Sequence, residues 1–352
     1  DAEVTDPRSR SILVRHIAPM SAGHRTEQWD RALAADRQEP VRGFLLEPPD
    51  GTPGVTFAYS QSTTYTLAAI IQRVTGQTLL DYLRPRLFEP LGVDRALWTQ
   101  HPAGRDVGFA GLHTTTEAVA CLGQLHLQGG VWNGKQLLAP EWIAEATRAQ
   151  VDNGTDPESD WAQGYGFQFW MARHGYRGDG AYGQFCVALP DQDVVLALTA
   201  ETPDLQGVLN AAWTHLLPAF EGAGPDATAA DAALTRRLTD LRVPFLAEAD
   251  AEPDAELPTV QLDVARSDLT RLTRITLAPH ELTLHEDDGT ATTLPLAAGA
   301  WPVRGHLAAR AARTGPTTVE AHVQFVQSPH KLHISCDLRI GTNSARIGFP
   351  IA

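Results

Sequence analysis

Residues 57–76 place the tightest constraint on what this chain can fold into. The second half of this stretch repeats apolar side chains with the spacing of one helical face: Leu67, Ile70, Ile71 and Val74. Ser62 or Thr63 can cap the start of such a helix, and Gly76 can end it. We therefore expect a helix whose apolar face is buried in the core.

A short polar segment before this helix presents Tyr59 and Gln61. In an extended segment the two side chains point the same way, because side chains alternate along the backbone. A phenol acts as a general base where neighbouring cations lower its pKa, and a carboxamide can orient a substrate carbonyl. Spacing alone favours a simpler interpretation, a capped helix with two exposed polar residues.

The composition argues against several classes of protein. Aspartate and glutamate number 42 against 28 lysines and arginines, so an electrostatic footprint for nucleic acid is missing. The sequence has no run of 18 apolar residues, and we expect no membrane span. Cys121, Cys186 and Cys336 are far apart, which predicts buried free thiols and no metal site. We expect no cofactor. The sequence does not decide the cellular compartment of the protein, although it favours the cytoplasm.

Near residue 165 the apolar spacing changes from helical to alternating. The runs 165–173, 182–189 and 194–199 have the pattern of β-strands, and a turn begins at Pro190 between the last two. We predict that these runs form neighbouring antiparallel strands. An apolar face over 205–216 predicts a closing helix after them.

A domain boundary is predicted near residues 221–226, where apolar periodicity gives way to alanine, glycine and acidic residues. Residues 1–222 would form the first domain. Beyond the boundary, one short helix and several strand-like runs predict a small β-rich accessory domain over 227–352. Asp288-Gly289 is a good two-residue hairpin turn within it.

Several blocks in residues 57–92 are similar to the serine β-lactamase-related hydrolases, a group of class C β-lactamases, DD-peptidases and esterases. The blocks are Phe57-Ala58-Tyr59-Ser60-Gln61, Ile70-Ile71, Thr75-Gly76, Tyr82-Leu83 and Leu87-Phe88-Glu89-Pro90-Leu91-Gly92. The second motif of that family is Tyr-x-Asn. Tyr59 matches its tyrosine, and Gln61 stands in place of the asparagine, with an amide displaced by roughly 1.5 Å.

Residues 176–184 resemble the strand that carries the third motif of that family, Lys-Thr-Gly. Gly178-Asp179-Gly180 lies at this position. Gly180 allows a substrate to approach the backbone, and the resemblance gives the N–H of Ala181 to the oxyanion hole. Gly178 stands in place of the lysine of that motif. Arg177 would supply the missing positive charge only if its side chain turns inward. The alternative is a glycine-rich strand start with no chemistry.

The first motif, Ser-x-x-Lys, places a lysine about one helical turn after the nucleophile. Its one occurrence, Ser328-Pro329-His330-Lys331, lies in the β-rich region between strand-like runs and is interpreted as a coincidence. We expect the functional motif upstream of residue 1, on a segment or chain that would be a partner of this one.

The resemblance implies an α/β (α+β) fold of the β-lactamase/transpeptidase type, an antiparallel sheet with flanking helices, N-terminally incomplete. It implies a serine hydrolase that forms an acyl-enzyme with a small-molecule or peptide substrate: an ester, amide, D-amino-acid peptide or β-lactam. Tyr59 would be general base or acid, Gln61 a positioner and Ala181 an oxyanion donor. Asp179, Gly180 and Arg177 would bind substrate. The alternative is a non-catalytic, penicillin-binding-like recognition module.

Overall fold

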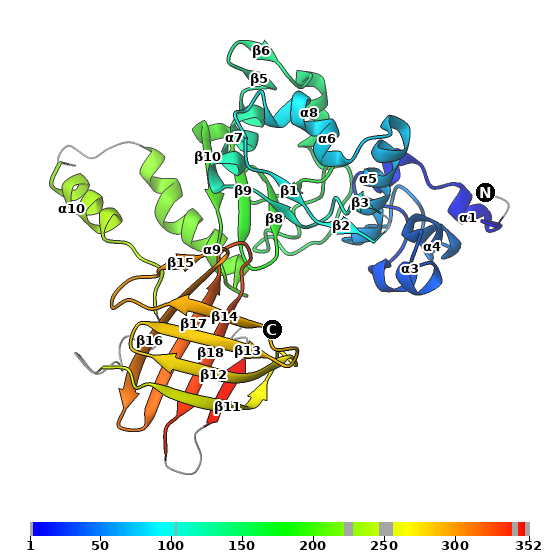
Figure 1. The fold of residues 1–352 in the computed structure, drawn as a ribbon. Helices are drawn as coiled ribbons and strands as arrows, with labels where there is room; N and C mark the ends of the chain where they lie inside the picture. The colour runs from blue at the N-terminus through cyan, green and yellow to red at the C-terminus, as the bar shows by residue number, and fades with distance from the viewer. Residues whose placement is uncertain (1–2, 103, 222–227, 246–255, 340–343, 349–352) are drawn as a thin grey trace. The chain divides into compact units, whose positions relative to one another are not determined.

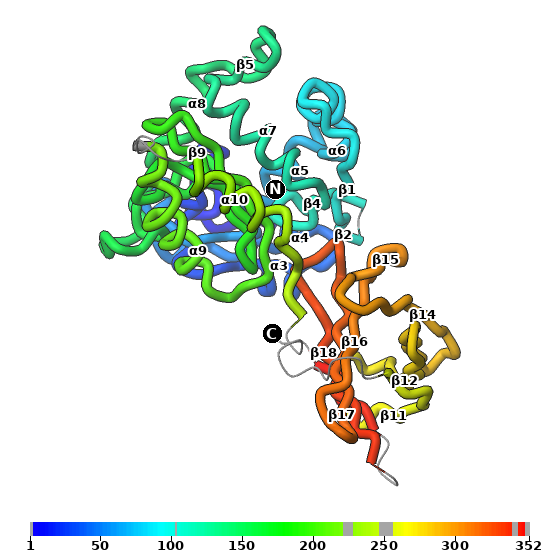
Figure 2. Tube along the Cα trace, turned by 90° about the vertical axis from the view of Figure 1, so that its left-hand side faces the viewer, coloured from blue at the N-terminus to red at the C-terminus, as the bar shows by residue number. Residues whose placement is uncertain are grey.

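The computed structural model describes residues 3–102, 104–221, 228–245, 256–339 and 344–348 (Figure 1). The chain divides into two compact units, Asp1–Gly222 and Ala223–Ala352. Figure 2 shows the trace from the side.

The first unit begins with short helices, and longer ones follow. Its α-helices are α1 (Pro7–Arg10), α2 (Val14–Ile17), α3 (Trp29–Ala35), α4 (Pro40–Leu46), α5 (Gln61–Thr75), α6 (Leu79–Leu83), α7 (Thr116–Leu127), α8 (Pro140–Ala146) and α9 (Leu205–Ala211). Its π- and 3-10-helical turns are Arg84–Phe88, Pro190–Gln192, Ala212–Leu216 and Leu217–Glu221. No helix in the described ranges is both long enough and apolar enough to cross a bilayer.

Helix α5 ends where the sequence predicts but begins earlier. Gly76 closes it in the left-handed region at φ 69°, a conformation that glycine adopts without steric cost. At the other end Ser60, and neither Ser62 nor Thr63, is the cap. Its backbone is extended and its hydroxyl accepts the Thr63 N–H at 3.3 Å, which satisfies one free donor of the first turn.

The prediction of which face of α5 is buried is wrong. Ile70 and Ile71 are 36% and 38% exposed, and Val74 is 80% exposed. The helix instead buries a face of small and polar residues against residues 105–108. Gln72 exchanges hydrogen bonds with the backbone of Asp106 at 2.9 and 3.1 Å. The amide of Gln72 is therefore satisfied, which removes the usual penalty for burying it.

A four-stranded antiparallel sheet forms the centre of the first unit within the described residues. Its order is β10 (Val194–Leu198), β9 (Gln184–Leu189), β8 (Tyr176–Gly180) and β7 (Trp170–Met171). Helix α7 packs so closely on one face that a Cβ at Gly123 would lie 2.6 Å from Val195. Leu209 and Trp213, from α9 and the turn after it, pack on the other face against alternate residues of β9: Phe185, Val187 and Leu189.

The predicted meander is right for its last two strands and wrong for its first. Runs 182–189 and 194–199 contain β9 and β10, which pair as expected. Only Trp170–Met171 of run 165–173 is a strand, because Gln168 breaks the run with a positive φ of 66°. Strand β8, which the alternating pattern did not predict and which only the family resemblance placed within residues 176–184, lies between β7 and β9, so the first and second predicted runs are not neighbours.

Outside the sheet, short strands of the first unit form three two-stranded pairs in the described residues. They are β1 (Leu97–Trp98) with β4 (Leu112–His113), β2 (Gln100–His101) with β3 (Arg105–Asp106), and β5 (Val131–Trp132) with β6 (Lys135–Gln136). Thr115 caps α7 by accepting the Ala118 N–H, and Thr78 caps α6 by accepting the Asp81 N–H. These caps fall where Ser/Thr side chains precede the apolar runs.

The second unit contains α10 (Thr228–Thr239) and a nine-stranded sheet within the described residues. Its strands are β11 (Val260–Ser267), β12 (Leu272–Ala278), β13 (Glu281–Glu286), β14 (Ala291–Pro295), β15 (Val303–Arg304), β16 (Leu307–Gly315), β17 (Thr318–Phe325), β18 (Lys331–Asp337) and β19 (Ser344–Gly348). Their order is β14-β13-β12-β11-β19-β18-β17-β16-β15, and only β11 and β19 pair in parallel.

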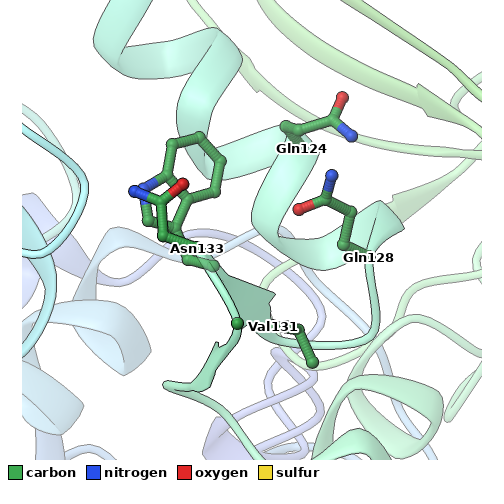
Figure 3. A pocket seen from close by; sticks show the side chains of 6 residues that line it. Gln124, Gln128, Val131 and Asn133 are labelled. Atoms are coloured by element: carbon green, nitrogen blue, oxygen red, sulfur yellow. The ribbon is translucent and has the colours of Figure 1, made fainter.

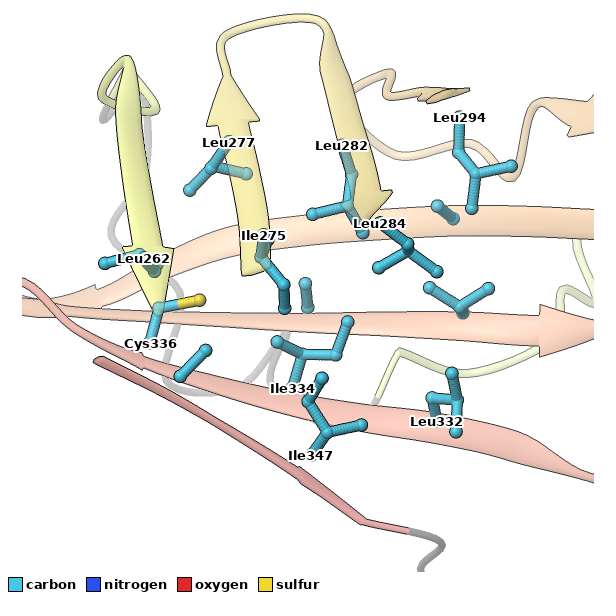
Figure 4. Close-up of a cluster of buried hydrophobic side chains, with 14 of the residues drawn as sticks. Leu262, Ile275, Leu277, Leu282, Leu284, Leu294, Leu332, Ile334, Cys336 and Ile347 are labelled. Atoms are coloured by element: carbon cyan, nitrogen blue, oxygen red, sulfur yellow. The ribbon is translucent and has the colours of Figure 1, made fainter. Parts of the chain in front are cut away.

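One face of this sheet forms the core of the second unit (Figure 4). Every second residue of the long strands points into it, as the period of two requires. Ile275, Leu282 and Ile334 are among its fully buried members. The Arg304 guanidinium in β15 donates to the Thr293 carbonyl in β14 at 2.6 Å, so the sheet curls until its end strands meet.

A buried carboxylate, Asp160, ties the sheet of the first unit to α9. Its side chain is inaccessible to solvent and accepts hydrogen bonds from Arg173, from the Gln206 amide at 2.7 Å and from the Trp213 indole at 3.0 Å. Burial alone would raise the pKa of Asp160, but these hydrogen bonds outweigh it and hold the pKa below its ordinary value.

Replacing Asp160 by asparagine is expected to lower the free energy of unfolding by about 3–5 kcal/mol, because Arg173 loses a buried partner. Since the folded-state pKa of Asp160 is lowered, its contribution is present above the unfolded-state pKa and is lost as pH falls through the folded-state value. Urea denaturation at several pH values would measure both effects, and Asp160→Asn should remove that part of the acid sensitivity.

Glu158→Gln is the matched control, because Glu158 also pairs with Arg173, at 3.3 Å, but its side chain is 84% exposed. We expect it to change the free energy of unfolding by less than about 1 kcal/mol. Equal effects of the two substitutions on the free energy of unfolding would show that the carboxylate of Asp160 does not tie the sheet to α9.

Candidate active site

An aromatic cluster lies where the segment before α5 meets β7. The ring of Tyr59 stacks on Trp170 with centroids 5.2 Å apart and planes inclined by 21°. Tyr165 meets Trp170 edge-on at 4.9 Å and Tyr59 at 6.3 Å. Tyr165 is buried, whereas Tyr59 remains 45% exposed. The cluster therefore presents one accessible phenol on a rigid aromatic base.

Backbone contacts and one carboxylate hold the tyrosine segment in place. The Ala58 N–H donates to the Met20 carbonyl at 3.1 Å. Glu27 accepts the N–H groups of Gln28 and Trp29 at 2.7 and 2.8 Å, and that of Gln61 at 2.5 Å. One carboxylate thus satisfies free donors at the starts of both α3 and α5, where negative charge is also favoured by the helix dipoles.

The loop before β7 is fixed to α5 by Gln168. Its side-chain carbonyl accepts the Thr64 hydroxyl at 2.8 Å, and its NH₂ donates to the Ala18 carbonyl at 2.8 Å. The positive φ that interrupts the predicted strand is what turns this side chain toward α5. The same residue therefore breaks the strand and sets the position of the loop that carries Tyr165.

Arg177 turns inward and is completely buried. Its guanidinium lies over Trp161 at 4.5 Å and over Trp170 at 5.7 Å, and its Nη1 donates to the Asp160 carbonyl at 2.8 Å. An ion pair of 3.1 Å joins it to Asp179, whose side chain is 7% exposed. Arg177 thus has the inward orientation that the sequence analysis required for a cation in the site, but the Asp179 carboxylate already neutralises its charge.

Burial acts on both members of this pair. It raises the pKa of Asp179 above its ordinary value, against the attraction of Arg177 and hydrogen bonds from Trp170 and Trp161. It also lowers the pKa of Arg177, against the attraction of Asp179 and Asp160. An Arg–carboxylate pair packed between indoles is charged but desolvated, so each member depends on the other to stay ionised.

The Tyr59 phenol is neutral at physiological pH in this environment. Partial burial, followed by the carboxylates of Asp179 and Glu27, raises the pKa of Tyr59 to about 12. A general base needs the opposite shift, which a neighbouring cation would supply. As the described residues stand, Tyr59 can donate a hydrogen bond or relay a proton but is not a phenolate.

The remaining predicted residues lie around this cluster. Gln61 is the first residue of α5, so the alternation expected of an extended segment does not place it beside Tyr59. Gly180 ends β8 directly after Asp179, and Ala181 is exposed in the turn that follows. Among the described turn and loop hydrogen bonds, none has the Ala181 N–H as its donor.

The structure shows a large space at Gly178. A Cβ built there meets no atom within 4 Å, so a side chain would fit where the family motif has lysine. Gly183 is different, because its φ is +87° and a Cβ would lie 3.1 Å from Ala200 and Thr202. Glycine is therefore required by the turn at position 183 but not by packing at position 178.

Sequence reasoning missed most of the residues that build this site. They are Glu27, Asp160, Trp161, Tyr165, Gln168 and Trp170. None of them lies within a motif block, and none has a local spacing that marks it. The available signal in the sequence was the grouping of Trp161, Tyr165 and Trp170 within ten residues.

The serines beside the aromatic cluster are buried. Ser21, Ser60 and Ser62 are 1%, 3% and 2% exposed. Ser60 caps α5, and the Ser21 hydroxyl donates to the His16 carbonyl at 3.0 Å. Across the described ranges no group of three His, Cys, Asp or Glu side chains could hold a metal ion.

Comparison with known families agrees with this arrangement. Residues 2–219 match the family model described as Beta-lactamase. This chain belongs to the beta-lactamase family. The resemblance read from the motif blocks is thereby confirmed, and so is the α/β fold class.

A curated relative of this beta-lactamase family member is the 6-aminohexanoate-dimer hydrolase of Paenarthrobacter ureafaciens. It is 30% identical over 197 residues, which cover 52% of this chain and 47% of the relative. The chain therefore spans about half the length of that relative.

Solved structures are also similar to this chain. A Bacillus anthracis protein assigned as a 6-aminohexanoate-dimer hydrolase matches with a TM-score of 0.50 and 18% identity, over 69% of this chain and 65% of that one. The octameric penicillin-binding protein homologue of Pyrococcus abyssi matches with a TM-score of 0.43 and 14% identity, over 96% of this chain and 79% of that one.

The charge environment of Tyr59 can be tested directly. Asp179→Asn removes a carboxylate that raises the pKa of Tyr59 and leaves Arg177 unpaired, so that pKa should fall from about 12 toward its ordinary value of 10. NMR titration of ¹³C-labelled tyrosine would follow it. Asp191→Asn, at the turn before β10, is the control and should leave the Tyr59 titration unchanged. An unaltered Tyr59 titration in Asp179→Asn would contradict the assignment.

Proposed function

We propose that this chain is the substrate-orienting part of a serine hydrolase that transfers an acyl group to water through an acyl-enzyme. One observation carries the proposal: the Tyr59 phenol lies on Trp170 under the influence of Asp179, so the second and third motif regions converge. Family membership and the hydrolase relative support the reaction class.

Each residue has a defined part in such a reaction. The serine oxygen gives its proton to the neutral amine of the lysine carried beside it and bonds to the substrate carbonyl carbon, and the Ala181 N–H stabilises the oxyanion that forms. The protonated Tyr59 donates its proton to the leaving oxygen or nitrogen as that bond breaks. A water molecule then gives a proton to the Tyr59 oxygen while its own oxygen bonds to the acyl carbon, and the serine oxygen leaves and takes its proton back from the lysine. Gln61, at the start of α5, would position the polar groups of the substrate.

The substrate we propose is a neutral or cationic ester or short linear amide. Recognition of a substrate carboxylate needs an available cation, and Arg177 is already paired with Asp179 at 3.1 Å. Gly178 offers no charge where the family motif has lysine. The name of the curated relative, a 6-aminohexanoate-dimer hydrolase, supports the linear amide class over β-lactams, but it does not support the exclusion of carboxylates, since the 6-aminohexanoate dimer itself ends in one.

The nucleophile we propose comes from a segment or chain that carries serine and lysine together. The first unit offers two apolar surfaces for it: the exposed side chains of Ile70, Ile71 and Val74 on α5, and the outer edge of β10. An edge strand with unpaired backbone groups readily accepts another strand. Both surfaces lie outside the aromatic cluster.

A non-catalytic recognition module is the second candidate. The burial of Ser21, Ser60 and Ser62 favours it, because none of them presents an accessible hydroxyl beside Tyr59. Such a module would use the same aromatic cluster to bind an ester or amide without cleaving it.

A labelling experiment separates these two functions. The chain alone, and the chain extended by the coding sequence that precedes Asp1, would be treated with a serine-reactive fluorophosphonate and assayed with p-nitrophenyl esters, short amides and a chromogenic β-lactam. We expect one labelled serine and turnover of esters and amides only in the extended form. Tyr59→Phe should then lower kcat by about 10²–10⁴-fold.

Tyr82→Phe in α6 is the matched control, because it removes a phenol elsewhere in the first unit, and it should retain full turnover. Stoichiometric labelling of the chain alone, abolished by Tyr59→Phe, would overturn the external nucleophile. Absence of labelling in both forms, with retained binding of the ester, would favour the recognition module.

A further inference from the structure

An open pocket of about 600 Å³ lies between the C-terminal half of α7 and the β5–β6 hairpin (Figure 3). Its volume falls within the range of about 300–1,000 Å³ usual for small-molecule sites. The residues that line it are Gln124, Gln128, Val131, Trp132, Asn133 and Gly134. None of them takes part in the aromatic cluster around Tyr59.

The lining combines amide side chains with apolar surface and carries no ionisable group. Gln124 and Gln128 are four residues apart on α7, so their amides lie on the same face one turn apart, and Asn133 lies across from them (Figure 3). Within the described residues these three amides and the Trp132 indole make no hydrogen bond to the chain. Their donors and acceptors are available to a ligand.

The walls of the pocket are held by the fold. Gly123 brings α7 so close to the sheet that a Cβ would lie 2.6 Å from Val195. Asn133 and Gly134 make the hairpin turn with φ of 48° and 75°. The Gln136 amide donates to the Gly129 carbonyl at 2.8 Å and fixes the base of the hairpin to the end of α7. The polar side chains therefore project from a rigid frame.

We propose that this pocket binds a neutral saccharide. Sugar hydroxyls both donate and accept hydrogen bonds, as carboxamides do, and the apolar face of a pyranose ring can lie against an indole. A charged ligand would find no counter-ion in the lining. A purely apolar ligand would displace the water that hydrogen-bonds to the three amides. It would offer them no hydrogen bonds in exchange, which is unfavourable.

Isothermal titration of the full chain with cellotriose and N,N′,N″-triacetylchitotriose tests the proposal. We expect one saccharide to bind with a dissociation constant on the order of 1 mM or tighter. The double variant Gln124→Ala, Gln128→Ala should weaken binding at least about tenfold. Trp132→Phe, which keeps an aromatic ring but removes the N–H, should weaken it less.

Trp142→Ala is the matched control, because Trp142 is a 50% exposed tryptophan on the next helix, α8, outside the pocket. It should leave saccharide affinity unchanged. The proposal would be overturned if neither sugar bound at a sugar concentration 10-fold above that dissociation constant. It would also be overturned if the glutamine double variant bound the sugar as tightly as the unaltered chain. Binding of a neutral peptide such as tri-alanine in place of both sugars would overturn the ligand class.

Discussion

The buried carboxylate of Asp160 is the interaction on which the site of the first unit depends. Its side chain accepts hydrogen bonds from Arg173, Gln206 and Trp213, and its carbonyl accepts one from Arg177. It therefore joins the loop before β7, the sheet and α9 at one point. Because Arg177 orients Asp179 and lies over Trp161 and Trp170, the geometry of the aromatic cluster depends on Asp160 through its backbone carbonyl as well as through its carboxylate.

The ion pair in the cluster determines what chemistry is open to Tyr59. Arg177 would lower the pKa of a nearby phenol if it were unpaired, but Asp179 cancels its charge and itself raises that pKa. A cation brought into the site would act in the opposite direction and move Tyr59 toward a base. The protonation state of the phenol is thus a property of the charges assembled around it, and no feature of the Tyr-x-Gln motif fixes it alone.

Local rules predicted the parts of this fold that are local. The existence of α5, its end at Gly76 and the strands β9 and β10 follow from apolar period and turn residues. The buried face of α5 was mispredicted, because Gln72 both donates to and accepts from the backbone of Asp106, a residue 34 positions away. The alternating pattern did not find strand β8, which only the family resemblance placed, for a similar reason: Arg177 and Asp179 are charged and become buried only as a pair.

The site could be predicted only where the family motifs lie. Tyr59, Asp179 and Gly180 are found by comparison of short blocks, whereas Trp161, Trp170 and Glu27 act through contacts between distant segments. Glu27 is an example: it is an exposed acidic residue in sequence, and only the fold reveals that it accepts N–H groups from the starts of two helices. A sequence pattern carries no signal for such a shared partner.

Strand geometry shows why the altered third motif is not a conservative change. Side chains alternate along β8, so Arg177 and Asp179 share one face and Gly178 belongs to the other. An arginine one position before the motif therefore cannot replace a lysine at position 178, since it enters the site from the opposite face and meets Trp161 and Asp179 there. The empty space at Gly178 lies on the face where the family lysine would project. The chain has thus exchanged an accessible cation for a buried, internally neutral pair, and this exchange shifts its proposed specificity away from carboxylate-bearing substrates.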